Sequence, residues 1–181
     1  MGRFAQIGGI PGIRLDIVGL AETRAKLSDL EVRLEDFNPL WDMVTELMIE
    51  HETEWFSTEG EGSWPELKET YLKRKLRDGF PPDILIRTGH LLETLVSPDA
   101  GEVSQGRTTL GTFTLKTFNW GTDDPVAEYH QDGAPERRTH WGTPNPLPAR
   151  PVLVVTPSLL TQLGQAQDAF LELLIEEAGL G

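Results

Sequence analysis

Apolar residues recur at helical spacing in three long stretches of the chain. Residues 20–34 place leucines at turn-to-turn intervals among charged residues, which predicts a first amphipathic helix. An Asn-Pro pair opens a second stripe over residues 38–56, and because proline is favourable at the first helical position, a longer helix is expected there. A third stripe over residues 159–178 predicts a long C-terminal helix.

A shorter, basic segment lies at residues 68–77, where the apolar positions again recur at helical spacing. Leu67, Tyr71 and Leu72 are expected to face inward because they share one side of the segment. The basic side chains are expected to face solvent; they are Lys68, Lys73, Arg74, Lys75 and Arg77.

Alternating apolar and polar residues, together with β-branched and aromatic ones, predict several short strands. The expected strands are residues 13–17, residues 84–86, residues 152–155 and a hairpin of residues 108–117 with 118–121. Two short helices are expected after polar caps, Thr88 for a helix that carries Leu91 and Asp124 for a helix over residues 126–131.

These elements predict a single α+β domain over residues 13–178, with amphipathic helices packed on a small antiparallel sheet. The glycine-rich residues 1–12 are expected to form a flexible N-terminal arm, and residues 179–181 a short tail. Residues 132–150 hold Gly, Pro, Arg and Trp without a period, which marks a long loop. Since long loops in compact domains commonly carry function, we expect this one to contact a neighbouring protein.

The acidic composition narrows the classes of partner. The 181 residues hold 16 Lys and Arg against 29 Asp and Glu, for a net charge of −13. Such a field repels DNA phosphates, so we expect no sequence-specific nucleic-acid binding, although an acidic lining would let genomic DNA pass without capture. The chain has no cysteine, which excludes disulfides and thiolate metal sites. No apolar stretch approaches the roughly 20 residues that span a bilayer, so no membrane contact is expected.

Candidate catalytic groups are few and poorly spaced. His130 near Asp132 suggests an acid–base pair, but without a nucleophile at a recognisable spacing a hydrogen-bonded structural histidine is favoured. His51 lacks the second histidine one turn away that a zinc helix needs. The glutamates one turn apart over residues 46–54 could suggest the paired carboxylates of a lytic enzyme, yet their mutual repulsion favours a solvated face. We therefore expect no catalysis, no metal and no cofactor.

Contact candidates are basic residues and one tryptophan. Arg87 is placed to pair with a carboxylate, although a plain turn explains it more simply, and Trp141 either anchors an interface or folds back onto its own chain. The basic residues 68–77 and the acidic row 46–54 complement each other, which makes a charge-matched subunit interface testable. The candidate interface residues are Arg87, Lys73, Arg74, Arg137, Arg138, Trp141 and Arg150.

Two blocks of motif residues follow one another within residues 40–157. The first holds Phe56, Glu59-Gly60, Trp64-Pro65-Glu66-Leu67 with Thr70 and Lys73, and Ile84-Leu85-Ile86-Arg87-Thr88-Gly89-His90-Leu91 with Leu95. The second holds Gly121-Thr122, Ala127-Glu128-Tyr129-His130-Gln131-Asp132-Gly133 and Pro148-Ala149-Arg150-Pro151 with Val152-Leu153. In this order they resemble the virion-morphogenesis, or tail-completion, family of tailed bacteriophages. The motif residues expected to be structural are Trp64, Pro65, Thr88, Gly89, Tyr129, His130, Gly133 and Pro151.

The resemblance implies a virion protein of the phage neck, at the head-proximal end of the tail, assembled in the host cytoplasm. It implies a ring of copies of this chain, sixfold like the tail tube, that joins the tube to the head-side connector. A tail terminator or a head-closure protein of the same neck is the alternative within this class. A virion-associated lytic enzyme using Glu50 or His130, and a free chaperone of tail assembly, are the alternatives outside it.

Overall fold

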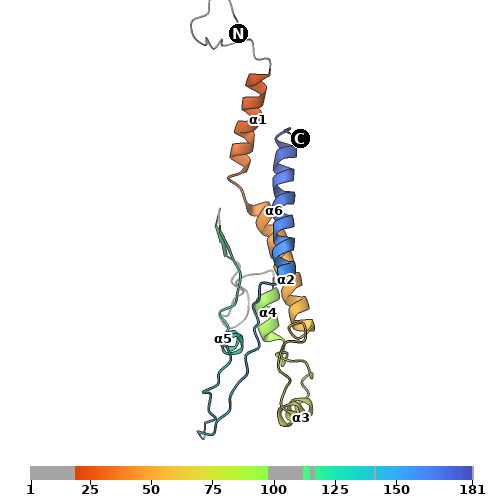
Figure 1. The fold of residues 1–181 in the computed structure, drawn as a ribbon, viewed down its shortest axis with the longest axis vertical. Helices are drawn as coiled ribbons and strands as arrows, with labels where there is room; N and C mark the ends of the chain where they lie inside the picture. The colour runs from red at the N-terminus through yellow and green to blue at the C-terminus, as the bar shows by residue number, and fades with distance from the viewer. Residues whose placement is uncertain (1–18, 98–111, 115–116, 141, 181) are drawn as a thin grey trace, which may run out of the picture. The chain divides into compact units, whose positions relative to one another are not determined.

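The computed structural model describes residues 19–97, 112–114, 117–140 and 142–180 (Figure 1). The described chain divides into two compact units, one from the described residues of Met1–Asp36 and Ala169–Gly181, the other from Phe37–Asp168. The predicted arm at residues 1–12 and strand at residues 13–17 lie outside the described residues. The elements, in chain order, are α1 (Leu20–Arg33), α2 (Asn38–Ser57), α3 (Glu69–Arg77), α4 (His90–Val96), β1 (Thr112–Thr114), β2 (Thr117–Asn119), α5 (Pro125–Gln131) and α6 (Pro157–Glu177).

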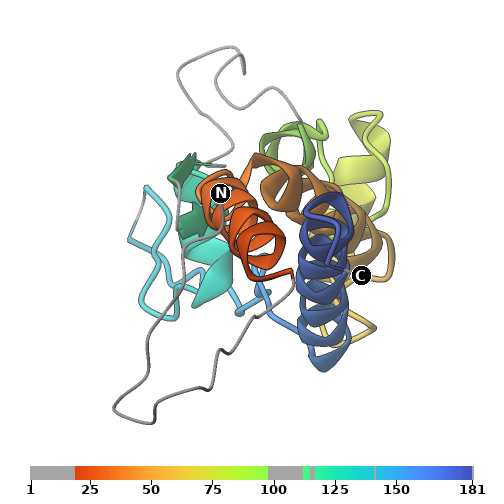
Figure 2. The same cartoon turned by 90° about the horizontal axis from the view of Figure 1, so that it is seen from above.

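The first unit pairs α1 with the C-terminal part of α6, and the two helices lie side by side in both views (Figure 1, Figure 2). The Arg33 guanidinium joins them, with Nη1 2.5 Å from Glu177 Oε2 and Nε 2.8 Å from Asp29 Oδ2. α1 buries none of its side chains, and Leu27 is 53% exposed. The predicted first helix is therefore confirmed, but the described chain does not cover its apolar side.

The second unit is built around α2 and α4, which pack against each other. Their apolar side chains meet those of α5 and the connecting segments in one core, with Phe56 and Leu95 fully buried. The buried members of this core are Trp55, Phe56, Trp64, Ile84, Leu91, Leu95, Ala127 and Val152. Since burying one large apolar side chain contributes about 1.5–3 kcal/mol, this core is the main source of hydrophobic stabilisation in the unit.

The two short helices begin at different kinds of cap. The N-cap of α4 is Gly89, in the left-handed region at φ 84°, so the predicted cap at Thr88 is wrong. Thr88 Oγ1 only accepts a long hydrogen bond, 3.4 Å, from the His90 amide. The predicted cap of α5 is confirmed, because the Asp124 carboxylate accepts from the Val126 amide at 2.8 Å.

α6 confirms the predicted C-terminal helix. Thr156 Oγ1 accepts from the Leu159 amide at 3.1 Å, and Pro157 fills the first helical position, where no amide partner is needed. The helix buries Leu159 and Phe170. Neither α6 nor any other helix of the described chain is long and apolar enough to cross a membrane.

The sheet is smaller than predicted: among the described residues it is one hairpin, in which β1 pairs antiparallel with β2. Residues 84–86 are not a strand, since Leu85 takes a φ of 61° that interrupts an extended path. Residues 152–155 are not a strand either, because the Gln131 side chain takes the place of a partner strand there. The predicted fold class is thus confirmed in part: the amphipathic helices are present, but the fold is mainly helical, and the expected sheet is only a small hairpin among the described residues.

Residues 132–150, predicted as a long loop, form an irregular two-stranded extension after α5 (Figure 1). From here on, 'the arm' means this extension and not the predicted N-terminal arm. Ala134 and Leu147 exchange two backbone hydrogen bonds of 2.9 and 3.0 Å. Farther along, the Thr139 amide donates to the Thr143 carbonyl at 2.8 Å. Backbone pairing therefore gives the arm a defined path without a regular strand.

Candidate functional site

The two motif blocks meet at the carbonyl of Pro151. The indole Nε1 atoms of Trp55 and Trp64 both donate to this oxygen, at 2.9 and 3.0 Å. A carbonyl oxygen has two lone pairs, so it satisfies both donors at once. The Trp64 ring also meets Phe56 edge-on, with ring centroids 5.3 Å apart. Residues from the start of the first block and the end of the second are thus held together.

Arg150 continues this connection inside the fold. Its side chain is buried, at 4% exposure, and donates from Nε to the Pro65 carbonyl at 2.8 Å and from Nη2 to the Glu66 carbonyl at 3.1 Å. Burial lowers the pKa of the guanidinium, and these carbonyl acceptors offset part of the cost of removing it from water. Arg150 was predicted as a subunit contact; its position instead makes it an internal support.

Gln131 and Gly133 hold the other side of the same segment. The Gln131 amide accepts from the Val152 and Leu153 amides at 2.9 and 3.0 Å and donates to the Leu153 carbonyl at 2.9 Å. Gly133 has a φ of 75°, and a Cβ there would lie 2.7 Å from the Ala149 nitrogen, so only glycine fits. We refer to the segment around Pro151 with these partners as the Pro151 cluster.

A groove of about 1300 Å³ opens between α3, the segment before α4, α5 and the arm. All these walls belong to the second unit. The volume exceeds the roughly 300–1,000 Å³ of common small-molecule sites, and Tyr129, which lines it, is 57% exposed. The predicted contact residues that line it are Arg74, Arg87, Arg137 and Arg150. Tertiary structure therefore brings together residues from three separate segments that the sequence singled out one by one.

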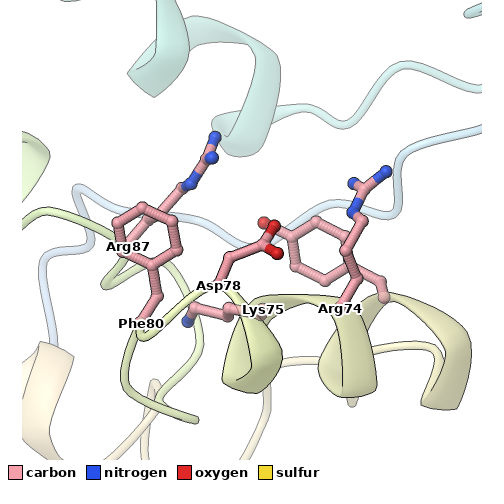
Figure 3. A pocket seen from close by; sticks show the side chains of 6 residues that line it. Arg74, Lys75, Asp78, Phe80 and Arg87 are labelled. Atoms are coloured by element: carbon pink, nitrogen blue, oxygen red, sulfur yellow. The ribbon is translucent and has the colours of Figure 1, made fainter.

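Two of these arginines stack on aromatic rings at one end of the groove (Figure 3). The Arg87 guanidinium carbon lies 4.5 Å from the Phe80 ring centroid, and that of Arg74 lies 5.3 Å from the Tyr71 ring centroid. A cation stacked on a ring is held in place by the ring's quadrupole. Its N–H groups lie in the guanidinium plane and stay available to an acceptor.

Lys75 corrects the prediction that the basic side chains of this helix all face solvent. It is buried, and its Nζ donates to the Asp83 carbonyl. Burial lowers the pKa of this amine, while the nearby Asp83 carboxylate raises it. The lysine thus fastens α3 to the segment that follows it and is not available at the surface.

Two further contact candidates, Lys73 and Arg138, are not among the residues that line the groove. Lys73 is exposed and pairs with Glu69 one turn earlier, and Arg138 donates to the Gly142 carbonyl at 3.0 Å within the arm. Trp141 lies outside the described residues. Exposed pairs of this kind contribute little to stability, so both cations remain accessible.

His130 was expected to be a hydrogen-bonded structural histidine, but its buried Nδ1 has no hydrogen-bond partner among the described residues. Burial, with the positive charges of Arg150 and Arg137, lowers the pKa of His130 to about 4, so its imidazole is neutral at pH 7. His90 Nε2 lies 3.8 Å from Asp124 Oδ2 at the groove wall, and His51 Nε2 hydrogen-bonds the Val154 carbonyl at 2.9 Å. Within the described ranges no three His, Cys, Asp or Glu residues gather as a metal site.

Sequence reasoning missed the roles of two polar residues, the half-buried Gln131 and the buried Glu52. Nothing in the sequence around Gln131 indicates that its side chain replaces a strand. Glu52 is 1% exposed, its Oε2 has no hydrogen-bond partner among the described residues, and burial raises its pKa to about 8. Its spacing from Val44 and Trp55 was a usable signal, because all three share the buried side of α2.

The chain was compared with family models, with curated proteins and with solved structures, and none of the three comparisons found a match.

Proposed function

We propose that this chain is a structural protein of a tailed-bacteriophage virion, a neck or tail-completion component that works as a ring of identical copies. The observation that carries the proposal is the bonding between the two motif blocks. Trp64 donates to the Pro151 carbonyl, and Arg150 donates to the carbonyls of Pro65 and Glu66. Motif residues that merely recur in order can do so by chance. Residues that also bond to one another across the fold form one cooperating set, as expected of a structural family signature.

Two surface features fit a protein whose activity is assembly. The groove collects arginines and exposed apolar side chains that no other described part of the chain covers. α1 exposes its leucines although a helix of its length is marginal in water without packing. In the proposed ring, neighbouring copies and the adjoining neck and tail-tube proteins cover these surfaces, while the net charge of −13 keeps passing DNA from adhering.

The proposed mechanism contains no catalytic step and no cofactor. Each copy presents one surface to the next in a head-to-tail contact, and closure of the circle, sixfold by resemblance, produces the connector between the tail tube and the head. The tail-terminator and head-closure positions of the same neck use the same assembly principle and differ in location.

Detection of the chain in purified virions tests this proposal, together with the mass of the purified full-length protein. We expect the chain in finished particles and a mass that is a multiple of the monomer. Separate analysis of purified tails and purified heads assigns the neck layer. Absence from infectious particles would overturn the proposal, and peptidoglycan turnover that is lost in Glu50→Gln or His130→Ala would favour the lytic enzyme.

A further inference from the structure

The exposed side of α2 is a row of acids without a counter-charge. Asp42, Glu46, Glu50 and Glu54 are exposed and spaced four residues apart, and α2 contains no Lys or Arg. The structure shows no ion pair for any of them among the described residues. Like charges one turn apart repel each other and destabilise a helix. This row, the acidic face, extends over about 18 Å of helix.

The groove contains exposed arginines that could pair with such acids. Arg74, Arg87 and Arg137 are exposed, line the groove, and have no side-chain hydrogen bond within the described residues. Figure 3 shows the Arg74 and Arg87 guanidinium groups on the same side of the α3 ribbon. Because stacking on Tyr71 and Phe80 already restricts them, they lose little further freedom when they bind a carboxylate.

The acids around the groove do not cancel this charge. Among the exposed side chains that line it, Glu66 and Glu136 stand against Lys68, Arg74, Arg87 and Arg137. Lys75 and Arg150 are left out of this balance because they are buried and bond to carbonyls of their own chain. Asp124 is buried and caps α5, so its charge is partly used inside the fold. The groove therefore carries a net positive charge in a chain that is strongly acidic as a whole.

We infer that the groove of one copy binds the acidic face of α2 from a second copy. This inference rests on the proposed function, and it names the contact that closes the ring. α2 contributes no residue to the groove lining of its own chain, and both features belong to one compact unit. A contact that joins two different surfaces of identical copies is head-to-tail, the type that generates rings. Arginine–carboxylate pairs set its register and orientation.

Complementary charge reversal tests the inference on the full-length chain. One variant reverses the groove, Arg74→Glu with Arg87→Glu, and the other reverses the acidic face, Glu46→Lys with Glu50→Lys. Each alone is expected to self-associate at least about tenfold more weakly than the unchanged chain, because every contact then juxtaposes like charges. Mixed in equal amounts, the two variants restore every contact, so assemblies with alternating copies are expected in analytical ultracentrifugation.

Two control variants test whether the effect depends on where the charge is reversed and not merely on the change in net charge. Lys73→Glu changes the same helix outside the groove lining, and Glu172→Lys changes an exposed acid on α6; both are expected to associate normally. Circular dichroism verifies that each variant is folded. Both pairs of substitutions lie at exposed positions, so the fold is expected to survive them.

Three results would overturn the inference: unchanged association of either reversal variant, failure of the folded mixture to assemble, or a wild-type chain that stays monomeric at every concentration. These results concern the contact between copies, and the presence of the protein in virions is tested separately. Presence of the chain in particles, combined with normal association of both reversal variants, would leave the proposed function standing and assign the ring contact to another surface.

Discussion

The Pro151 cluster and helix α1 use their side chains in opposite ways. In the cluster, two tryptophans and a glutamine bond to backbone groups of residues 151–153, and Val152 at its centre is fully buried. Arg150 beside them donates to the carbonyls of Pro65 and Glu66. α1 buries nothing, and its ion pairs are at the surface. Both segments have a clear pattern of apolar and polar residues. The pattern alone therefore does not distinguish a region that is buried within its own chain from one that stays exposed.

The cluster and α1 contribute very differently to the free energy of unfolding. Cluster residues contribute by buried area and by hydrogen bonds whose loss leaves buried donors unpaired. The exposed pairs of α1 each contribute at most about 1 kcal/mol. Substitutions in the cluster should therefore act on folding, and substitutions on α1 should act on assembly.

The largest effect is expected for Trp64→Ala. It removes a buried ring from the core and one of the two donors to the Pro151 carbonyl, at a cost of about 3–5 kcal/mol in the free energy of unfolding. Urea unfolding followed by circular dichroism measures this cost. Trp64→Phe is the matched control, since it keeps most of the apolar volume and loses the hydrogen bond. A loss below 1 kcal/mol for the alanine variant would show that the cluster does not stabilise the unit.

Gly133→Ala is expected to cost somewhat less, about 2–4 kcal/mol, because it combines left-handed strain with a backbone clash at Ala149. The same substitution at Gly142, which also has a positive φ but an open surrounding, isolates the strain from the clash. Thermal unfolding of both variants makes the comparison. Equal losses at the two positions would contradict the close approach.

Glu52→Gln is expected to change how the free energy of unfolding depends on pH. The folded state raises the pKa of Glu52 from 4.5 to about 8, so the folded chain holds a proton that the unfolded chain releases. The resulting stability is complete below pH 4.5 and is lost as pH rises through about 8, at up to about 1.4 kcal/mol per pH unit. Glutamine cannot ionise, so the variant should gain stability relative to wild type across this window. A stability difference that stays constant from pH 5 to about 8 would contradict a buried neutral Glu52.

The smallest effect on folding is expected for Leu27→Ala on α1, within about 0.5 kcal/mol, because its side chain is largely exposed. Sedimentation of the same variant reports whether this surface takes part in assembly. A loss of several kcal/mol in unfolding would show that α1 is covered within its own chain.

Much of the helical framework could be predicted from sequence. The three long helices were expected at nearly their observed positions, and the Asp124 cap followed from an Asp-Pro pair. The predicted strands at residues 84–86 and 152–155 failed for a common reason: short apolar runs specify burial but not what pairs with the backbone. Leu85 has a positive φ, outside the extended region. The Gln131 side chain accepts from the backbone amides of Val152 and Leu153, to which a neighbouring strand would otherwise bond.

The candidate site was predicted in part. Arg74, Arg87 and Arg137 were singled out separately and line one groove, whereas Arg150 and Lys75 were expected at the surface and are buried. Residue type and helical phase do not settle such cases, because a long cationic side chain can bury its stem and bond to whichever carbonyl lies nearby. The buried carbonyl acceptors here come from Pro65, Glu66 and Asp83.

The amino-acid pattern was enough to predict the three long helices, the Asp124 cap of α5 and the acidic composition, because these depend on neighbours within a few turns of chain. Tertiary structure alone decided which polar residues are internal and which stay at the surface. Pro151 meets Trp55 and Trp64 only after the chain has folded, since its carbonyl has no partner near it in sequence. Hydrogen bonds between residues so far apart in sequence depend on the packing of the whole core, and the local sequence pattern does not predict them.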